Sequence, residues 1–303
     1  MTSIDYTFEA WANEWYTRHK RRISTSTAES YGYTLRLLDG NFGRWPLVSI
    51  KAMDIEDYLF ALQEQGYSDS QVTKCRGMLY QIMQKAVAND LIGKNPVQYA
   101  EKLRHRGPKR QKDAFSVEEI AQLDRLLPLD KLGLSIRLML ATGIRTQELL
   151  ALEPEHIEPD GSMLHIVQAV KVAKGKPYVG PPKSAASLRD VPVPQNARSY
   201  AIQLRGSADG QKYVWQASDN QQPYDPAYFR RKFRRYLQNA GVRALTPHCC
   251  RHTYVSQMQA LGVDISTIQA IVGHTDPDMT RHYLHIQSGV IEDAIAKYNE
   301  LLA

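Results

Sequence analysis

The sequence predicts a mainly α-helical protein with a small antiparallel β-sheet, an α+β fold organised in two domains. Three observations support this prediction. Apolar residues recur at helical spacing through residues 1–100 and again from residue 114 onwards. Residues 101–113, between these parts, are strongly basic and nearly free of apolar side chains, as in an exposed linker. Residues 163–193 contain short alternating segments separated by glycine and proline, which is typical of strands.

Composition narrows the class of protein. The chain has 303 residues, 43% of them hydrophobic, so each of two domains can form its own core. There is no apolar run of about 18 residues and no signal-peptide pattern, so we expect a cytoplasmic protein that does not bind membranes. Cys75, Cys249 and Cys250 include no CxxC pair, and neither a disulfide framework nor a zinc site is predicted. A net charge of +6 suggests an anionic partner only where basic residues cluster.

The first domain is predicted to be entirely helical. Four amphipathic segments carry its apolar stripes, at residues 8–15, 31–38, 55–62 and 72–86. Lys and Arg side chains alternate with these stripes, which fits either a solvated surface or a side that faces DNA. In the following linker, Lys109 and Arg110 belong to a basic run that could cross a phosphate backbone between two domains gripping one duplex.

The second domain, residues 114–303, is predicted to begin with two helices. Ser116 and Glu119 form a capping box, and a later helix ends at Gly143. Arg145 and Glu148 follow, three residues apart. This pair is either a surface ion pair worth about 0.5 kcal/mol or an arginine held by a carboxylate so that its fork points at a substrate.

The alternating segments are predicted to form the small sheet, with Lys183 in the connection between its last two strands. Lysines in exposed hairpins are common and usually inert. Residues 226–240 then predict an amphipathic helix with Phe229, Phe233 and Leu237 inward. Five cations cover its other side: Arg230, Arg231, Lys232, Arg234 and Arg235. Because neighbouring like charges repel, we interpret this side as a DNA-contacting surface.

The stretch from Thr246 to Tyr283 has the densest set of reactive side chains: His248, Arg251, His274 and Tyr283. Guanidinium groups bind non-bridging phosphate oxygens, and imidazole holds or moves a proton near neutral pH. Each residue also has a plain structural alternative as a buried histidine, an ion-pair partner or a core tyrosine. Metal binding by His248, Cys249, Cys250 and His252 is a weaker alternative, because consecutive side chains do not all converge on one ion.

Taken in order, these groups resemble the tyrosine recombinases, also called phage integrases. The matching segments are ATGIRTQELLAL around Arg145, PKSAASLRDVPV around Lys183, TPHCCRHTYVSQM around His248 and Arg251, and VGHTDPDMTRHY around His274 and Tyr283. Four segments in the right order are far more specific than any one of them. The resemblance covers nearly the whole chain from about Phe8. Cys249 and Cys250 stand where the family often has an acidic residue and Leu.

The resemblance implies that Tyr283 attacks the scissile phosphate and forms a 3′-phosphotyrosyl link. Arg145 and Arg251 would bind the non-bridging oxygens, and Lys183 would protonate the 5′-hydroxyl leaving group. Glu148 would orient Arg145.

The remaining roles follow from the same resemblance. His248 would serve in proton transfer at the tyrosine hydroxyl, and His274 would hydrogen-bond the phosphate. With two guanidiniums and a lysine supplying positive charge, and no carboxylate cluster in the sequence to hold Mg²⁺, neither a metal nor another cofactor is predicted. ATP is not needed, because the phosphotyrosyl link conserves the bond energy.

The resemblance also implies partners and an architecture. A core-binding domain at residues 1–100, the linker at 101–113 and a catalytic domain at 114–303 would clamp double-stranded DNA, and four copies would act together on two recombination sites. An accessory directionality factor or a host DNA-bending protein would assist. The biological role would be integration or excision of a phage or other mobile element. Alternatives are an Xer-type resolvase, a type IB topoisomerase-like enzyme and a DNA-binding module without catalysis. A last helix at residues 290–302 would pack on its own domain or on a neighbouring copy.

Overall fold

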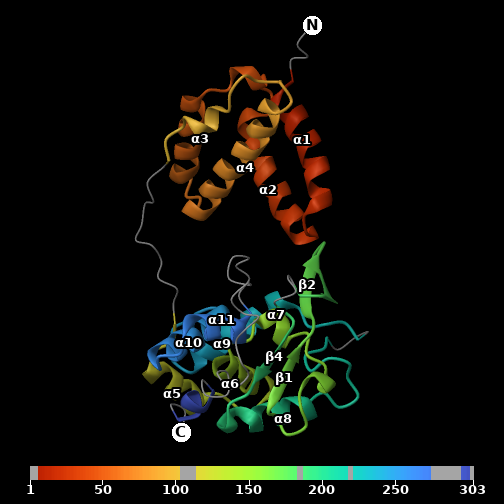
Figure 1. Cartoon of the computed structure of the whole chain (residues 1–303), viewed down its shortest axis with the longest axis vertical. Helices are drawn as coiled ribbons and strands as arrows, with labels where there is room; N and C mark the ends of the chain where they lie inside the picture. Colours follow the sequence, from red (N-terminus) through yellow and green to blue (C-terminus); the bar gives the residue numbers. More distant parts are fainter. Residues whose placement is uncertain (1–5, 103–113, 183–186, 218–220, 274–294, 301–303) are drawn as a thin grey trace. The chain divides into compact units, whose positions relative to one another are not determined.

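A computed structural model describes residues 6–102, 114–182, 187–217, 221–273 and 295–300. The chain divides into two compact units, Met1–Arg110 and Gln111–Ala303 (Figure 1). Helices dominate the described residues, and the strands form small antiparallel ladders, so the predicted fold class is confirmed. In the described part of the chain, no helix combines the length and the apolar character needed to span a membrane.

The first unit is built from the helices α1 (Phe8–His19), α2 (Thr25–Phe42), α3 (Ala52–Glu64) and α4 (Asp69–Val87), with short 3-10 turns η1 (Lys20–Arg22), η2 (Leu47–Ser49) and η3 (Pro96–Gln98). Side chains of Thr7, Ser24 and Ser68 accept backbone N–H groups and cap α1, α2 and α4. Helix α4 packs against α1, α2 and α3. The Trp11 indole donates to the Ile82 carbonyl at 3.0 Å and ties α1 to α4 inside the core.

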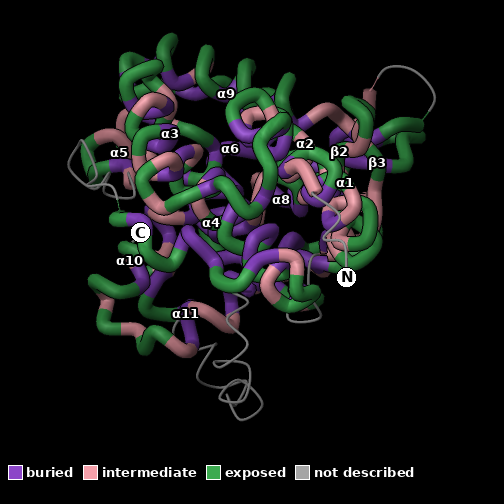
Figure 2. Tube along the Cα trace, turned by 90° about the horizontal axis from the view of Figure 1, so that it is seen from above, coloured by how far each residue is buried: buried purple, intermediate pink, exposed green. Residues whose placement is uncertain are grey.

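The second unit begins with α5 (Val117–Leu126), α6 (Lys131–Thr142), α7 (Thr146–Leu149) and the turn η4 (Pro154–His156). After the strands come the turn η6 (Gln195–Ala197), α8 (Arg198–Gly206), α9 (Pro226–Asn239), α10 (His248–Ala260) and α11 (Ile265–Val272). The capping box of Ser116 and Glu119 is present at the start of α5. Buried and exposed segments alternate along the helices, as expected for helices that each turn one side to a core (Figure 2).

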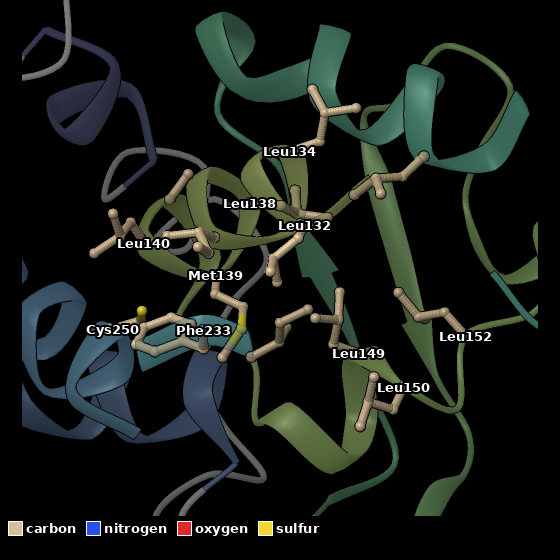
Figure 3. Packing of buried hydrophobic residues seen from close by; sticks show 14 of the residues in the cluster. Leu132, Leu134, Leu138, Met139, Leu140, Leu149, Leu150, Leu152, Phe233 and Cys250 are labelled. Atoms are coloured by element: carbon tan, nitrogen blue, oxygen red, sulfur yellow. The ribbon is translucent and has the colours of Figure 1, made fainter. Parts of the chain in front are cut away.

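Helix α6 is the centre of the second unit. All its residues from Leu132 to Thr142 are buried, and it packs against α7, α8, α9 and α10. Figure 3 shows its leucines and Met139 gathered with Phe233 from α9 and Cys250 from α10. Because α6 is packed against four other helices, its end fixes where the chain enters the next segment. The helix ends at Thr142, and the following residue, Gly143, has a left-handed backbone.

The strands form two separate ladders instead of one sheet. Strand β1 (Met163–Ile166) pairs antiparallel with β4 (Arg189–Pro192), and β2 (Ala169–Ala173) pairs antiparallel with β3 (Lys176–Gly180). Between β1 and β2, the Gln168 side chain donates to the Ala151 carbonyl at 2.8 Å and to Glu153 at 2.9 Å, which anchors the break. Lys174 and Gly175 both have positive φ at the β2–β3 turn, as a two-residue hairpin loop requires.

The described end of the chain packs on its own unit. Residues 295–300 are helical, and the Tyr298 ring lies 5.0 Å from the Tyr254 ring. The Tyr298 hydroxyl contacts Oε1 of Gln257 at 2.7 Å. The other residues of the predicted last helix lie outside the described residues.

Replacing Gly143 tests the close contact between the end of α6 and α10. A Cβ on Gly143 would lie 2.7 Å from Cδ1 of Tyr254, and the residue has a φ of +63°. A left-handed alanine costs about 1–2 kcal/mol, and overpacking adds about 1–3 kcal/mol. We expect Gly143→Ala to lower the free energy of unfolding by the sum, measured by urea denaturation followed by circular dichroism.

Gly175→Ala is the matched control, because its φ is +73° but no atom lies within 4 Å of the added Cβ. It should show only the backbone cost. Equal losses in the two variants would contradict the steric contact at Tyr254.

Candidate active site

The Arg145–Glu148 pair is buried at its carboxylate end. Arg145 is the N-cap residue of α7, and its backbone N–H donates to Oε2 of Glu148 at 2.9 Å. Nη1 of Arg145 forms an ion pair with Oε1 of Glu148 at 2.7 Å. The Glu148 side chain is only 3% exposed, whereas that of Arg145 is 26% exposed. A solvent-screened surface pair is therefore excluded, and Arg145 is the member nearer to the surface.

Glu148 has a second arginine partner, Arg189 at the start of β4. Nη1 and Nη2 of Arg189 donate to Oε1 and Oε2 of Glu148 at 3.0 and 2.9 Å. Together with the two donors of Arg145, they supply four hydrogen bonds, which is the full capacity of a carboxylate. Burial would raise the pKa of Glu148, but the hydrogen bonds and charge of Arg189, and then the charge of Arg145, hold that pKa below its usual value.

Arg251 lies in the interior of α10 and has unused donors. The residue is 1% exposed, and its Nη1 donates to the Gly143 carbonyl at 3.0 Å. Its Nε and Nη2 have no hydrogen-bond partner among the described residues. Leaving buried donors unpaired on a charged group costs several kcal/mol. An anion that accepts these two N–H groups would remove that cost.

The charges around Arg251 also favour a bound anion. The pKa of Arg251 is lowered to about 9, mainly by burial and then by the charge of Arg145, with a smaller lowering from Arg189, while the charge of Glu148 opposes them. Two cations and one carboxylate thus influence this guanidinium, so that with Arg251 itself three positive charges accompany one negative charge. A bound phosphodiester would compensate the excess positive charge.

Two of these arginines also hold the end of α11. Arg145 donates from Nη2 to the Gly273 carbonyl at 2.5 Å, and Arg189 donates from Nε to the Ile271 carbonyl at 2.8 Å. Gly273 has a left-handed backbone, as the helix stop in the sequence predicts. It directly precedes His274, so the arginine cluster lies at the entrance to the segment that carries the predicted nucleophile.

Helix α10 sends its reactive side chains in different directions. His248 is exposed at the first helical position and its ring lies 4.7 Å from that of His252. Cys249 and Cys250 are buried, and Cys250 belongs to the core that surrounds α6. The four residues of the weaker metal-binding alternative therefore do not converge. Within the described ranges no group of three or more His, Cys, Asp or Glu residues is placed to hold a metal ion.

Helix α9 has the amphipathic character that its sequence predicts. Phe229, Phe233 and Leu237 are buried. Its five cations are all exposed: Arg230, Arg231, Lys232, Arg234 and Arg235. The guanidinium of Arg231 lies 5.2 Å from the Tyr228 ring centre, and this arrangement combines positive charge with an exposed aromatic surface.

Several predicted site residues lie outside the described residues: Lys183, His274, Tyr283, Lys109 and Arg110. In the chain, Lys183 falls between β3 and β4. Of the predicted set, the structure thus brings together Arg145 and Glu148 at α7 with Arg251 of α10, which come from two separate segments.

Arg189 is the site residue that the sequence analysis did not single out. It lies in the PKSAASLRDVPV segment, in which Lys183 was the predicted site residue. A signal was present, because residues two apart on a strand share a face and Val191 and Val193 are both buried. An arginine on the buried face of a strand needs a carboxylate partner.

Removing the charge of Glu148 tests the cluster. In Glu148→Gln, Arg145 and Arg189 lose their common carboxylate and three guanidiniums remain close together. Breaking a buried pair in this way typically costs about 3–5 kcal/mol, and we expect that loss in the free energy of unfolding by urea denaturation at pH 7. Glu119→Gln is the control, because Glu119 binds Arg243, whose side chain is 51% exposed. It should lose about 1 kcal/mol or less, and a similar loss in both variants would contradict the cluster's special role.

Comparison with known proteins agrees with this geometry. The phage integrase family matches residues 114–289, and the phage integrase central domain matches residues 8–102. Tyrosine recombinase XerA of Pyrococcus furiosus is 28% identical over 211 residues, covering 67% of this chain and 68% of that protein. Tyrosine recombinase XerD of Rhizobium meliloti is 24% identical over 272 residues, covering 84% and 82%.

Solved structures show the same fold. The Tn1549 transposon integrase in complex with a circular intermediate DNA has a TM-score of 0.79 at 19% identity and matches 98% of this chain and 99% of that chain. The lambda integrase tetramer bound to a Holliday junction has a TM-score of 0.68 at 15% identity, covering 92% and 78%. The family match spans more than half of the chain, which therefore belongs to the phage integrase family and is a tyrosine-type site-specific DNA recombinase.

Proposed function

We propose that this recombinase cleaves and rejoins duplex DNA through a 3′-phosphotyrosyl intermediate at Tyr283, for integration or excision of a mobile element. The observation that carries this proposal is the buried guanidinium of Arg251, whose Nε and Nη2 have no partner among the described residues. With Arg145 close enough to lower its pKa, the site is suited to bind one phosphodiester.

In the proposed step, the Tyr283 oxygen forms a bond to the scissile phosphorus while the bond to the 5′-oxygen breaks. Arg145 and Arg251 bind the non-bridging oxygens, where charge develops in the transition state. Lys183 gives its proton to the 5′-oxygen, and His248 serves in proton transfer from the tyrosine hydroxyl. His274 hydrogen-bonds the phosphate. The reverse attack by a 5′-hydroxyl releases Tyr283 and rejoins the strand.

The proposed DNA grip uses both domains, residues 1–100 for core binding and residues 114–303 for catalysis, joined by the linker at 101–113. The linker cations Lys109 and Arg110 cross the backbone. The exposed cations of α9, Arg230, Arg231, Arg234 and Arg235, contact phosphates. By analogy with the lambda integrase tetramer on a Holliday junction, four copies exchange strands on two sites. A directionality factor or a DNA-bending protein assists.

Chromosome or plasmid resolution is the second candidate function. It is favoured by the similarity to recombinases named XerA and XerD. Supercoiled plasmids with two copies of the site in direct repeat, against pairs of plasmids with one copy each, separate resolution from integration. Relaxation without recombinant products would instead indicate a topoisomerase.

Replacing the predicted nucleophile gives the sharpest test. Wild-type protein mixed with fragmented DNA from the genome that encodes it should leave adducts that resist sodium dodecyl sulfate. Sequencing the attached DNA identifies the site. Tyr283→Phe should leave no adduct, because no oxygen remains to attack phosphorus.

Tyr228→Phe is the matched control, since Tyr228 is exposed on α9 and its ring has no proposed part in the reaction. It should form adducts as the wild type does. A covalent adduct in Tyr283→Phe would overturn the assignment of the nucleophile.

The DNA contact of α9 has its own test. Arg230→Gln combined with Arg234→Gln should weaken DNA binding and flatten its dependence on salt, because each lost phosphate contact reduces the log–log slope by about 0.9. Fluorescence anisotropy at several salt concentrations measures both effects. Arg125→Gln with Lys297→Gln removes the same charge from exposed positions elsewhere in the unit. An equal change of slope in this control would contradict a specific role of α9.

A further inference from the structure

We propose that Arg189 is a positioning residue for DNA cleavage. It fixes the carboxylate of Glu148, which orients Arg145, and it also holds the backbone at Ser187 and at Ile271. The inference rests on the proposed function and assigns a new residue to that site. Arg189 is not proposed to touch the DNA. Its effect passes through Glu148 and through two backbone carbonyls.

The contacts of Arg189 join three separate parts of the second unit. Its fork binds both oxygens of Glu148 on α7. Nη1 also donates to the Ser187 carbonyl at 3.1 Å, and Nε donates to the Ile271 carbonyl at 2.8 Å. Ser187 comes four residues after Lys183 in the chain, and Ile271 comes three residues before His274. The Arg189 guanidinium therefore contacts α7, which follows Arg145, the segment after Lys183 and the segment before His274 and Tyr283. The remaining proposed reactive groups, His248 and Arg251, are on α10.

Burial separates the roles of the two arginines. The side chain of Arg189 is 7% exposed and that of Arg145 is 26% exposed, although both bind the same carboxylate. Every guanidinium nitrogen of Arg189 donates to a protein atom. Arg145 donates to Glu148 and to the Gly273 carbonyl, but it is the more exposed partner, which a phosphate in solvent can reach. The more buried arginine, Arg189, thus holds Glu148 in place, and Glu148 holds the more exposed arginine, Arg145.

The surroundings of Arg189 require this guanidinium to keep one position. A Cβ on Gly273 would lie 3.0 Å from Nη1 of Arg189, so the fork packs directly against the backbone at the end of α11. Lysine carries the same charge but has no planar fork, and it cannot satisfy two carboxylate oxygens and two carbonyls in this arrangement. Geometry as well as charge is therefore needed.

Single-turnover cleavage tests the proposal, with saturating DNA that contains the site and a nick that traps the adduct. Rates are divided by the folded fraction measured by circular dichroism. We expect Arg189→Gln to cleave roughly 100-fold more slowly, the size of effect that a small misplacement of reacting groups produces, with unchanged affinity for DNA. Arg189→Lys, which keeps the charge, should fall between Arg189→Gln and the wild type.

The pH profile adds a measurement that a merely structural role would not change. Without Arg189, burial still raises the pKa of Glu148, and of the two arginines that bind its carboxylate only Arg145 remains to lower it. Glu148 then takes up a proton as the pH falls, and Arg145 loses its partner. The cleavage rate of Arg189→Gln should decline at a higher pH than the wild-type rate on the acid side.

A double-mutant cycle with Glu148→Gln completes the test. If Arg189 acts mainly through Glu148, adding Arg189→Gln to Glu148→Gln should slow cleavage by far less than the roughly 100-fold loss that Arg189→Gln causes in the wild-type background. Arg243→Gln is the control, because Arg243 forms a similar two-pronged pair with a different carboxylate, that of Glu119. Its rate per folded molecule should equal that of the wild type.

Three outcomes would overturn the inference while leaving the proposed function intact: wild-type cleavage by Arg189→Gln, additive losses in the double variant, or a loss confined to DNA affinity. An absence of any adduct with wild-type protein would instead overturn the proposed function, and this inference with it.

Discussion

The catalytic unit depends on one buried carboxylate. Glu148 accepts four hydrogen bonds from two arginines, and a third guanidinium, that of Arg251, senses its charge. A buried carboxylate is stable only when its partners surround it. The same condition gathers positive charge in one place, because each arginine that neutralises the carboxylate also raises the local potential. The proposed phosphate-binding site thus owes its positive charge to the partners that one buried carboxylate requires.

The enclosing fold makes this arrangement possible. Helix α6 is buried along nearly its whole length and ends at a left-handed Gly143, whose carbonyl accepts the hydrogen bond of Arg251. The exit from α6 therefore fixes both α7, which follows it, and α10, which packs against it. Packing of apolar side chains sets the positions of these helices. The polar side chains proposed to act on DNA, such as Arg145 and Arg251, lie near the N-terminal ends of α7 and α10.

Local rules predicted much of this from the sequence. The capping box at Ser116, the stop at Gly143 and the apolar stripe of α9 each depend on neighbouring residues, which a sequence shows directly. The division of the strands into two ladders was not predicted, because it depends on Gln168 reaching Ala151 and Glu153. Arg189 was missed for the same reason. Its partners at positions 148 and 271 become neighbours only in the folded chain.

The separation in sequence of Glu148, Arg189 and Ile271 has a consequence for folding. Contacts that close long loops form late, because the chain entropy lost on closure must first be compensated by local structure. The ion pair between Arg189 and Glu148 thus requires β4 to have docked beside α7, and the bond of Arg189 to Ile271 requires α11 as well. A partly folded chain that contains only the early helices would have the arginines but not their arrangement. In such a chain, the site proposed for strand cleavage would be incomplete until β4 and α11 have docked.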